Sequence, residues 1–427
     1  MRGAAGPLAS RKPLVALMTA QAMSIAGTRF STVAIPWYVL TTTNDPVLTG
    51  MVALVEMLPL VIARALGGPL IDRLGARTVS LLCDPVSIVV VALIPLLGSW
   101  NLLSLPALFA IVGVLGALRG PSDQAKYSLT PDVAAAAGMP LERATGIGGA
   151  VERLGSVAGA AVAGTLVVLF GAPMTLAFTA AALAVAVGCM AFGIPATPRP
   201  PRSQHPQAFR GYRDDLAAGW RFLSNDPVLV GITMMLAVTN LLDQAYVSVL
   251  VPVWAQHSGY GAQGVGVVLA VFAGFSFIGS ATAAALADKL PRLMVFGVAF
   301  FLMGLPRFLA LGLNLPTVTL FSVLAISGLA SGFLSPVLGA VLFERTPADL
   351  RGRVTSLNAA LCWSGIPFGG IIGGAMVATI GLTPALLVAG VTYAGATMLA
   401  FGRRRFRDFA AGAPLTDAEP VPPLSDV

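Results

Sequence analysis

Twelve long apolar stretches are the feature that most constrains how this chain folds. A helix needs about 20 apolar residues to cross a hydrocarbon core of about 30 Å. The chain is 56% hydrophobic and 11% charged, whereas a soluble domain carries about 25% charged residues. The stretches lie at 14–40, 47–70, 78–98, 105–127, 144–170, 173–194, 228–254, 264–286, 292–312, 317–342, 354–380 and 383–402. They predict an all-α integral membrane protein with twelve transmembrane helices.

The basic residues predict the orientation of this protein. Of the 26 Lys and Arg residues, all but five fall in segments that lie on one side of the membrane in this topology. Because cytoplasmic segments collect Lys and Arg, both termini are predicted to be cytoplasmic, in the plasma membrane. The five exceptions lie within predicted helices: Arg29, Arg64, Arg119, Arg153 and Arg307. The net charge of +7 follows from this bias and not from a nucleic-acid surface.

The chain repeats itself in two halves. At an offset of 216 residues, Pro36 matches Pro252 and Gly50 matches Gly266, and later the offset falls to 210. The predicted organisation is a six-helix bundle at 1–195, a linker at 196–227, a second bundle at 228–402 and a disordered tail at 403–427. The linker is Pro-rich at first and then has the pattern of an amphipathic helix on the inner leaflet.

A charged turn between the second and third apolar stretches stands out. In GGPLIDRLGAR, a helix end runs into a short polar loop, Arg73 to Arg77. Glycines there permit close approach and a tight turn. Asp72 can accept from amide groups at the start of a neighbouring helix. A degenerate copy carries Asp288. The alternative interpretation is a simple turn whose positive charges only fix the orientation of the chain in the membrane.

This turn resembles the signature loop of the major facilitator superfamily. The matching residues are Gly68, Asp72, Arg73, Gly75 and Arg77, with Ala76 where the family has a basic residue. With twelve spans and a duplicated half, the resemblance implies the two-bundle fold of that superfamily. It also implies that the loop latches the inner side shut in the outward-facing state, against the helix that begins near Arg353.

Glycines mark two further helices. The fifth stretch contains GSVAGAAVAG, which resembles the glycine motif of the drug-exporter branches, with Ala160 in place of its proline. Short elements such as AIPWYVL are similar to the macrolide and siderophore exporters. These glycines predict close helix packing, either in a rocking interface or in a static one. The packing glycines are Gly155, Gly159, Gly164, Gly365, Gly369 and Gly373.

Charged residues inside the spans are candidates for coupling and substrate contact. A charge near the bilayer centre costs at least about 2.5 kcal/mol and therefore faces a cavity or a partner. By depth, Arg29 and Glu56 are expected to form one ion pair. We expect Glu56, Glu152 or Asp243 to alternate between a proton and a partner, although static ion pairs are the alternative. The complete set is Arg29, Glu56, Arg64, Asp84, Arg119, Asp123, Glu152, Arg153, Asp243 and Arg307.

The predicted function is proton-coupled efflux of a small amphiphilic molecule by a functional monomer in the lipid bilayer, with the proton gradient as energy source and no cofactor. The alternatives are an uptake symporter of the same fold, which the glycine motif disfavours, and a receptor or assembly protein. An enzyme is disfavoured because His205 and His257 are the only histidines and no metal or nucleotide motif occurs. Seven aromatic residues near the predicted path form either a drug pocket or interfacial belts: Phe30, Trp37, Trp254, Phe272, Phe275, Phe277 and Trp363. Trp37 and Trp254, at helix ends, are assigned to the belts.

Overall fold

The computed structural model describes residues 11–195, 217, 219–286, 292–346 and 351–402. Each of the twelve predicted stretches is helical there, and a short helix, α5, follows α4. The helices are α1 (Lys12–Thr43), α2 (Pro46–Leu74), α3 (Ala76–Ser99), α4 (Leu105–Ser128), α5 (Thr130–Ala136), α6 (Leu141–Phe170), α7 (Ala172–Gly193), α9 (Pro227–Ala245), η1 (Tyr246–Leu250), α10 (Val251–His257), α11 (Gly261–Leu286), α12 (Arg292–Met303), α13 (Leu305–Gly312), α14 (Thr317–Arg345), α15 (Arg351–Ser364), α16 (Ile366–Ile380) and α17 (Leu382–Gly402).

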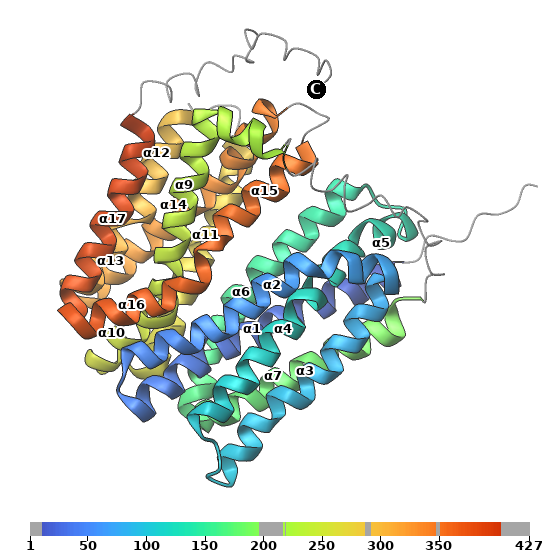
Figure 1. Cartoon of the computed structure of the whole chain (residues 1–427), viewed down its shortest axis with the longest axis horizontal. Helices are drawn as coiled ribbons and strands as arrows, with labels where there is room; N and C mark the ends of the chain where they lie inside the picture. Colours follow the sequence, from blue (N-terminus) through green and yellow to red (C-terminus); the bar gives the residue numbers. More distant parts are fainter. Residues whose placement is uncertain (1–10, 196–216, 218, 287–291, 347–350, 403–427) are drawn as a thin grey trace, which may run out of the picture.

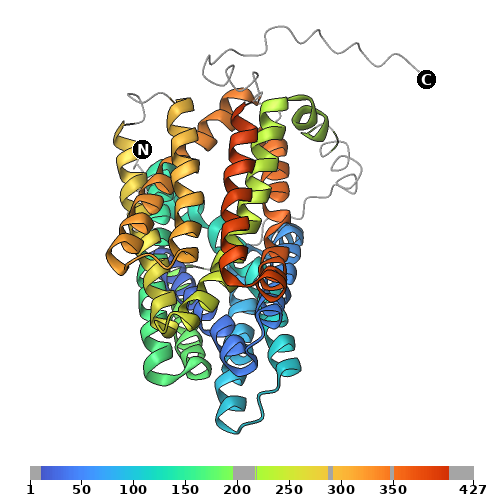
Figure 2. The ribbon, with the colours of Figure 1, turned by 90° about the vertical axis from the view of Figure 1, so that its left-hand side faces the viewer.

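The helices form two bundles, α1–α7 and α9–α17 (Figure 1). The bundles meet where α16 and α10 lie beside the ends of α1 and α2, and they spread apart towards α5 and α15. Figure 2 shows the same division from the side. We call the end at which the bundles meet the closed end, and the opposite end, where α1 begins, the basic end.

Equivalent glycines make the contact between the bundles at the closed end. A Cβ on Gly374 of α16 would lie 2.3 Å from the carbonyl oxygen of Pro46 in α2. A Cβ on Gly164 of α6 would lie 2.8 Å from the carbonyl oxygen of Ala262, in the first turn of α11. Gly374 and Pro46 are the repeat equivalents of Gly164 and Ala262. The two bundle contacts are therefore related by the internal repeat. Close helix approach in a membrane requires such small residues.

Three of the helical stretches in the second bundle are irregular at mid-length. A π-helical turn, η1, interrupts the first; a break at Gly304 separates α12 from α13; and a turn at Gly365 separates α15 from α16. Pro367 follows the last break and has no N–H to donate to the Trp363 carbonyl. Asn240 of α9 donates to the adjacent Cys362 carbonyl, at 3.0 Å.

The charged turn is shorter than the predicted loop Arg73 to Arg77. Helix α2 continues to Leu74 and α3 begins at Ala76, so Gly75 alone connects them, with φ of 84°. Arg77 donates to the carbonyls of Ala191 and Ile194 at 2.7 and 2.8 Å, and thereby caps the end of α7. The surroundings of Gly68 and the side chains of Asp72 and Arg73 lie outside the described part of the chain. The same holds for Asp288, for Phe209 to Leu216 of the linker and for the tail.

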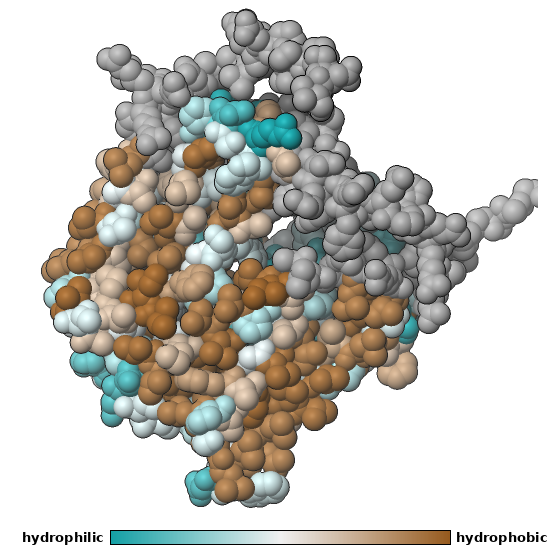
Figure 3. All heavy atoms as spheres, viewed as in Figure 1, coloured by the Kyte–Doolittle hydropathy of each residue, from teal (hydrophilic) through white to brown (hydrophobic). Residues whose placement is uncertain are grey.

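The surface is apolar around the middle of the molecule. Hydrophobic residues cover the sides of both bundles and polar ones gather towards the ends (Figure 3). Among the described residues, ten helices are long and apolar enough to span a membrane, and Gly297–Gly312 is a shorter apolar helix. The protein is thus a multi-pass membrane protein.

Candidate functional site

An ion pair between Asp243 and Arg307 lies in the middle of the second bundle. Asp243 comes from the last turn of α9, and Arg307 from the first turn of α13. The Arg307 side chain is 4% exposed, whereas that of Asp243 is 26% exposed. Arg307 is therefore enclosed, whereas the Asp243 carboxylate can be reached from outside the core.

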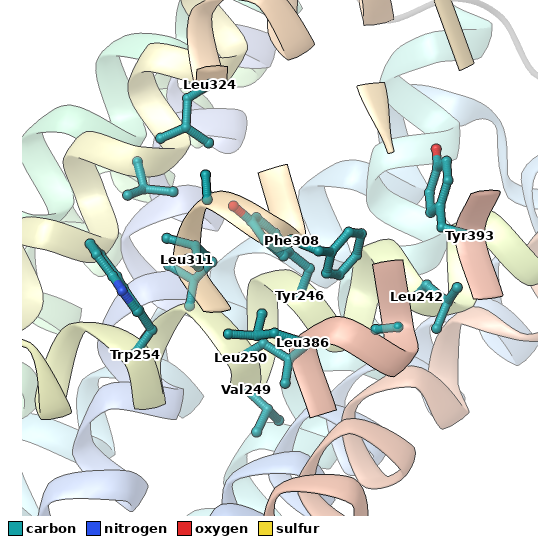
Figure 4. Close-up of a cluster of buried hydrophobic side chains, with 14 of the residues drawn as sticks. Leu242, Tyr246, Val249, Leu250, Trp254, Phe308, Leu311, Leu324, Leu386 and Tyr393 are labelled. Atoms are coloured by element: carbon teal, nitrogen blue, oxygen red, sulfur yellow. The ribbon is translucent and has the colours of Figure 1, made fainter. Parts of the chain in front are cut away.

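Aromatic rings surround the Arg307 guanidinium. Its Cζ lies 4.8 Å from the ring centroid of Tyr246, 5.1 Å from Phe308, 5.3 Å from Phe272 and 5.5 Å from Tyr393. Figure 4 shows the side chains of Tyr246 and Phe308 at the centre of the buried cluster, with Tyr393 at one side. A cation over such rings is attracted by their quadrupoles. We call these four residues the Arg307 cage.

The irregular turns build this cage. The π-helical turn begins at Tyr246, three residues after Asp243, and such turns are frequent at functional sites. The break at Gly304 leaves room for Tyr393, because a Cβ on Gly304 would lie 2.1 Å from that ring. Sequence reasoning named Phe272 and missed Tyr246, Phe308 and Tyr393. The sequence did contain one indication of the cage, which is Tyr246 at three residues after the embedded acid Asp243.

A second buried ion pair corrects one expectation. Glu56 of α2 pairs with Arg119 of α4 at 3.2 Å, and the two side chains are 6% and 4% exposed. The predicted pair of Glu56 with Arg29 is therefore wrong. Arg29 of α1 donates instead to the Ser156 hydroxyl of α6 at 3.1 Å. Arg29 and Glu56 lie on neighbouring helices, but their side chains turn to different partners.

A polar network connects α1, α3 and α4 nearer the basic end. Lys126 lies 2.9 Å from the Asp84 carboxylate and donates to the Ser24 hydroxyl at 3.0 Å. Ser24 in turn donates to Asp123 at 3.2 Å, and the Asp123 side chain is 41% exposed. Lys126 is one of the basic residues that the sequence analysis places on the cytoplasmic side. The structure adds that its side chain is enclosed, at 2% exposed, which the sequence did not predict.

Glu152 and Arg153 lie on α6 near Ser156. Glu152 is exposed, whereas Arg153 is partly buried. The structure thus places Arg29 close to this part of α6, where Gly159 packs directly against its side chain. The candidate charges of the first bundle do not form one site. They are divided among the Glu56–Arg119 pair, the Lys126 network, this group and Arg64, which contacts the second bundle.

One cation–π contact joins the two bundles. The Arg64 guanidinium of α2 lies 4.8 Å from the Trp363 ring of α15. Trp363 stands beside the break at Gly365, so the contact holds α15 near α2 where the bundles begin to separate. Sequence reasoning proposed both residues but did not pair them.

The predicted packing glycines divide into two groups. Gly155 and Gly159 pack on α1, and Gly365, Gly369 and Gly373 pack on α9, all within one bundle. Gly164 alone of the six meets the other bundle.

The tryptophans also differ from expectation. Trp254 was assigned to an interfacial belt, but it is 4% exposed and belongs to the core of the second bundle. Trp37 is partly buried and packs against the core of both bundles. Within the described residues, no group of three or more His, Cys, Asp or Glu side chains is placed to hold a metal ion.

Comparison with known proteins agrees with the fold. The model of the Major Facilitator Superfamily matches residues 17–262 and 233–422. The chain is 30% identical over 382 residues to the multidrug efflux pump Tap of Mycobacterium tuberculosis (strain ATCC 25618 / H37Rv), covering 87% of this chain and 89% of the pump. It is 27% identical to the enterobactin exporter EntS of Shigella boydii serotype 4, covering 91% and 89%.

Solved structures share the architecture at low sequence identity. The nucleoside transporter NupG superposes with a TM-score of 0.74 and 16% identity, over 92% of this chain and 100% of NupG. A D-xylose–proton symporter superposes with a TM-score of 0.67 and 13% identity, over 91% and 96%. These two likenesses show the fold alone.

Proposed function

Because the chain belongs to the major facilitator superfamily and is a membrane transporter, we propose that it exports a small amphiphilic molecule in exchange for protons, by alternating access. The relatives that are an efflux pump and a siderophore exporter support the direction. The basic end is then cytoplasmic, and the state described here is open towards the cytoplasm. Asp72 and its loop act as the inner latch, and one chain suffices for transport.

The partly exposed Asp243 is the observation that supports proton coupling. Its partner Arg307 is held by the cage as well as by the carboxylate, so part of the stabilisation of Arg307 persists when Asp243 is neutral. Asp243 can therefore exchange its ionic partner for a proton. Glu56 is more enclosed and lacks such a cage around Arg119 among the described contacts.

The charge of the substrate decides the direction of coupling at this site. A cationic substrate competes with the proton for Asp243, and competition for one group produces exchange. An anionic substrate would instead bind Arg307 when Asp243 is protonated, and the two would then travel together. Export in exchange for protons therefore favours cationic or donor-rich amphiphiles, and the second case describes the alternative, a symporter.

The test follows ethidium, an aromatic cation, in inverted membrane vesicles whose lumen is acidified. The wild-type protein should accumulate ethidium, and collapse of the pH gradient should release it. Asp243→Asn should lower accumulation by about tenfold or more, because the competing group is lost. Asp132→Asn, at an exposed position of α5, is the matched control. Gradient-dependent transport by Asp243→Asn at the wild-type rate would refute the assignment.

A further inference from the structure

Arg29, at mid-length of α1, has no carboxylate partner among the described residues. The buried cations Arg119, Lys126 and Arg307, by contrast, each form an ion pair. Arg29 is only partly buried, and an embedded charge faces either a partner or a cavity. We propose that Arg29 binds a carboxylate of the exported amphiphile. This inference rests on the proposed function and names a second charged group of its substrate.

The Arg29 side chain crosses from α1 to α6. Its stem packs on Gly159, where an added Cβ would lie 2.9 Å from the Arg29 Cβ. Its Nη2 atom donates to the Ser156 hydroxyl at 3.1 Å. The Nε atom is enclosed without a partner among the described residues, so it is not the atom that a ligand contacts. The Nη1 atom is not enclosed and has no acceptor within the described helices, which leaves it available to a ligand.

Ser156 lies on the face of α6 that borders the space between the bundles. The outer side of this helix carries exposed apolar side chains such as Leu154, and at about 100° per residue Ser156 lies almost opposite to Leu154. Glu152, one turn before Ser156 on the same face, is exposed. Gly149, almost a turn farther, has open space around its Cβ. Because the bundles spread apart towards the basic end (Figure 1), a ligand can reach this face and Arg29 from that end.

Glu152 determines which carboxylates suit this site. Its charge attracts that of Arg29, but the two side chains form no ion pair in the structure. A guanidinium presents N–H donors that match a carboxylate, whereas Glu152 repels a ligand whose only charge is negative. A ligand that carries a cationic group beside its carboxylate satisfies both residues. The substrate class that fits this site is therefore a zwitterionic amphiphile, whose cationic group is also the one that competes with the proton at Asp243.

The test compares rhodamine B, which is a zwitterion with a free carboxylate at neutral pH, with its ethyl ester, a cation of the same ring system. Binding to the full-length protein in lipid nanodiscs is measured by equilibrium dialysis without a pH gradient, and binding to empty nanodiscs is subtracted. The wild type should bind rhodamine B at least about fivefold more tightly than the ester. Arg29→Gln should weaken binding of rhodamine B by about tenfold and abolish this preference, because a charge-assisted hydrogen bond is lost.

Two further variants locate the site and keep the test valid if Arg29→Gln does not fold. Glu152→Gln should raise the preference for rhodamine B over the ester by about threefold, because repulsion of the carboxylate is removed while both probes lose the same attraction to their cationic ring. Arg143→Gln, at an exposed arginine near the start of the same helix, should keep the wild-type preference.

Four results would each overturn the assignment of Arg29. These are equal binding of the two probes by the wild type, an undiminished preference in Arg29→Gln, an equal loss of preference in Arg143→Gln, and an unchanged preference in Glu152→Gln. The vesicle test of export is independent, because binding here needs no gradient. Failure of ethidium export together with the expected preference in nanodiscs would refute the proposed export and support the Arg29 site.

Discussion

At the scale of single residues, the buried charges of the described helices are paired with side chains of opposite charge. Glu56 and Arg119 are the clearest case, since both side chains are almost completely enclosed. Removal of one partner leaves an uncompensated charge, which costs about 3–5 kcal/mol, whereas replacement of both by apolar groups is often neutral. The pair therefore offers a way to separate stability from transport.

We expect Glu56→Gln to lower the free energy of unfolding by about 3 kcal/mol, and the double variant Glu56→Leu/Arg119→Met to recover most of it. Thermal denaturation of the purified protein in detergent measures both. If the double variant is stable and also transports ethidium at the wild-type rate, the pair is structural only. A double variant that is as unstable as the single one would contradict the ion-pair argument.

A sequence predicts the position of a residue along its helix, but not the direction of its side chain. A rise of about 1.5 Å per residue placed Arg29 and Glu56 at similar depth. It did not say that Arg29 turns to Ser156 on α6 while Glu56 turns to α4. The burial of Lys126 was not predicted, because the residue lies at the end of a predicted span and its partner Asp84 comes from another helix. The Arg307 cage was missed because its members come from four separate helices.

At the scale of elements, the apolar stretches predicted every long helix but not the interruptions within them. Hydrophobic periodicity reports which residues face lipid or core, and a break of one residue leaves that pattern almost intact. The break between α15 and α16 lies beside Pro367, which has no N–H for the Trp363 carbonyl, and Asn240 donates to the neighbouring carbonyl of Cys362. In α3, by contrast, the helix runs through Pro85 without a break. Proline alone therefore does not predict where a helix is interrupted.

We expect this break to serve transport and not stability. Pro367→Ala restores an N–H that can reach the Trp363 carbonyl, so the helix should straighten without loss of stability. Ethidium transport should fall by about fivefold or more if the break is a hinge. Pro85→Ala is the matched control and should transport as the wild type does. Normal transport by Pro367→Ala would show that the bend is a static feature.

At the scale of the whole molecule, the internal repeat makes the two contacts at the closed end equivalent. Gly374 meets Pro46 as Gly164 meets Ala262, and Gly50 meets Gly370 as Gly266 meets Ala160. The repeat was visible in the sequence as matched prolines and glycines. The sequence did not show which glycines face the other bundle, because Gly373 and Gly374 are neighbours that point to different helices. The symmetry means that both contacts must separate together when this end opens.

This symmetry leads to a prediction about the balance between the closed and open states of this end. An alanine at Gly374 places a Cβ 2.3 Å from the Pro46 oxygen, and one at Gly164 places it 2.8 Å from the Ala262 oxygen. Either change destabilises the closed contact and shifts the population towards the state open at this end.

The opening is measured with a cysteine introduced at Ser248, which lies against Gly370, in a protein otherwise free of cysteine. An impermeant maleimide labels this cysteine when the end opens. Labelling should rise by about fivefold or more in Gly374→Ala and in Gly164→Ala. Gly149→Ala has open space around its Cβ and should label as the parent protein does, and equal labelling in all three would contradict the role of these contacts as the closed-end gate.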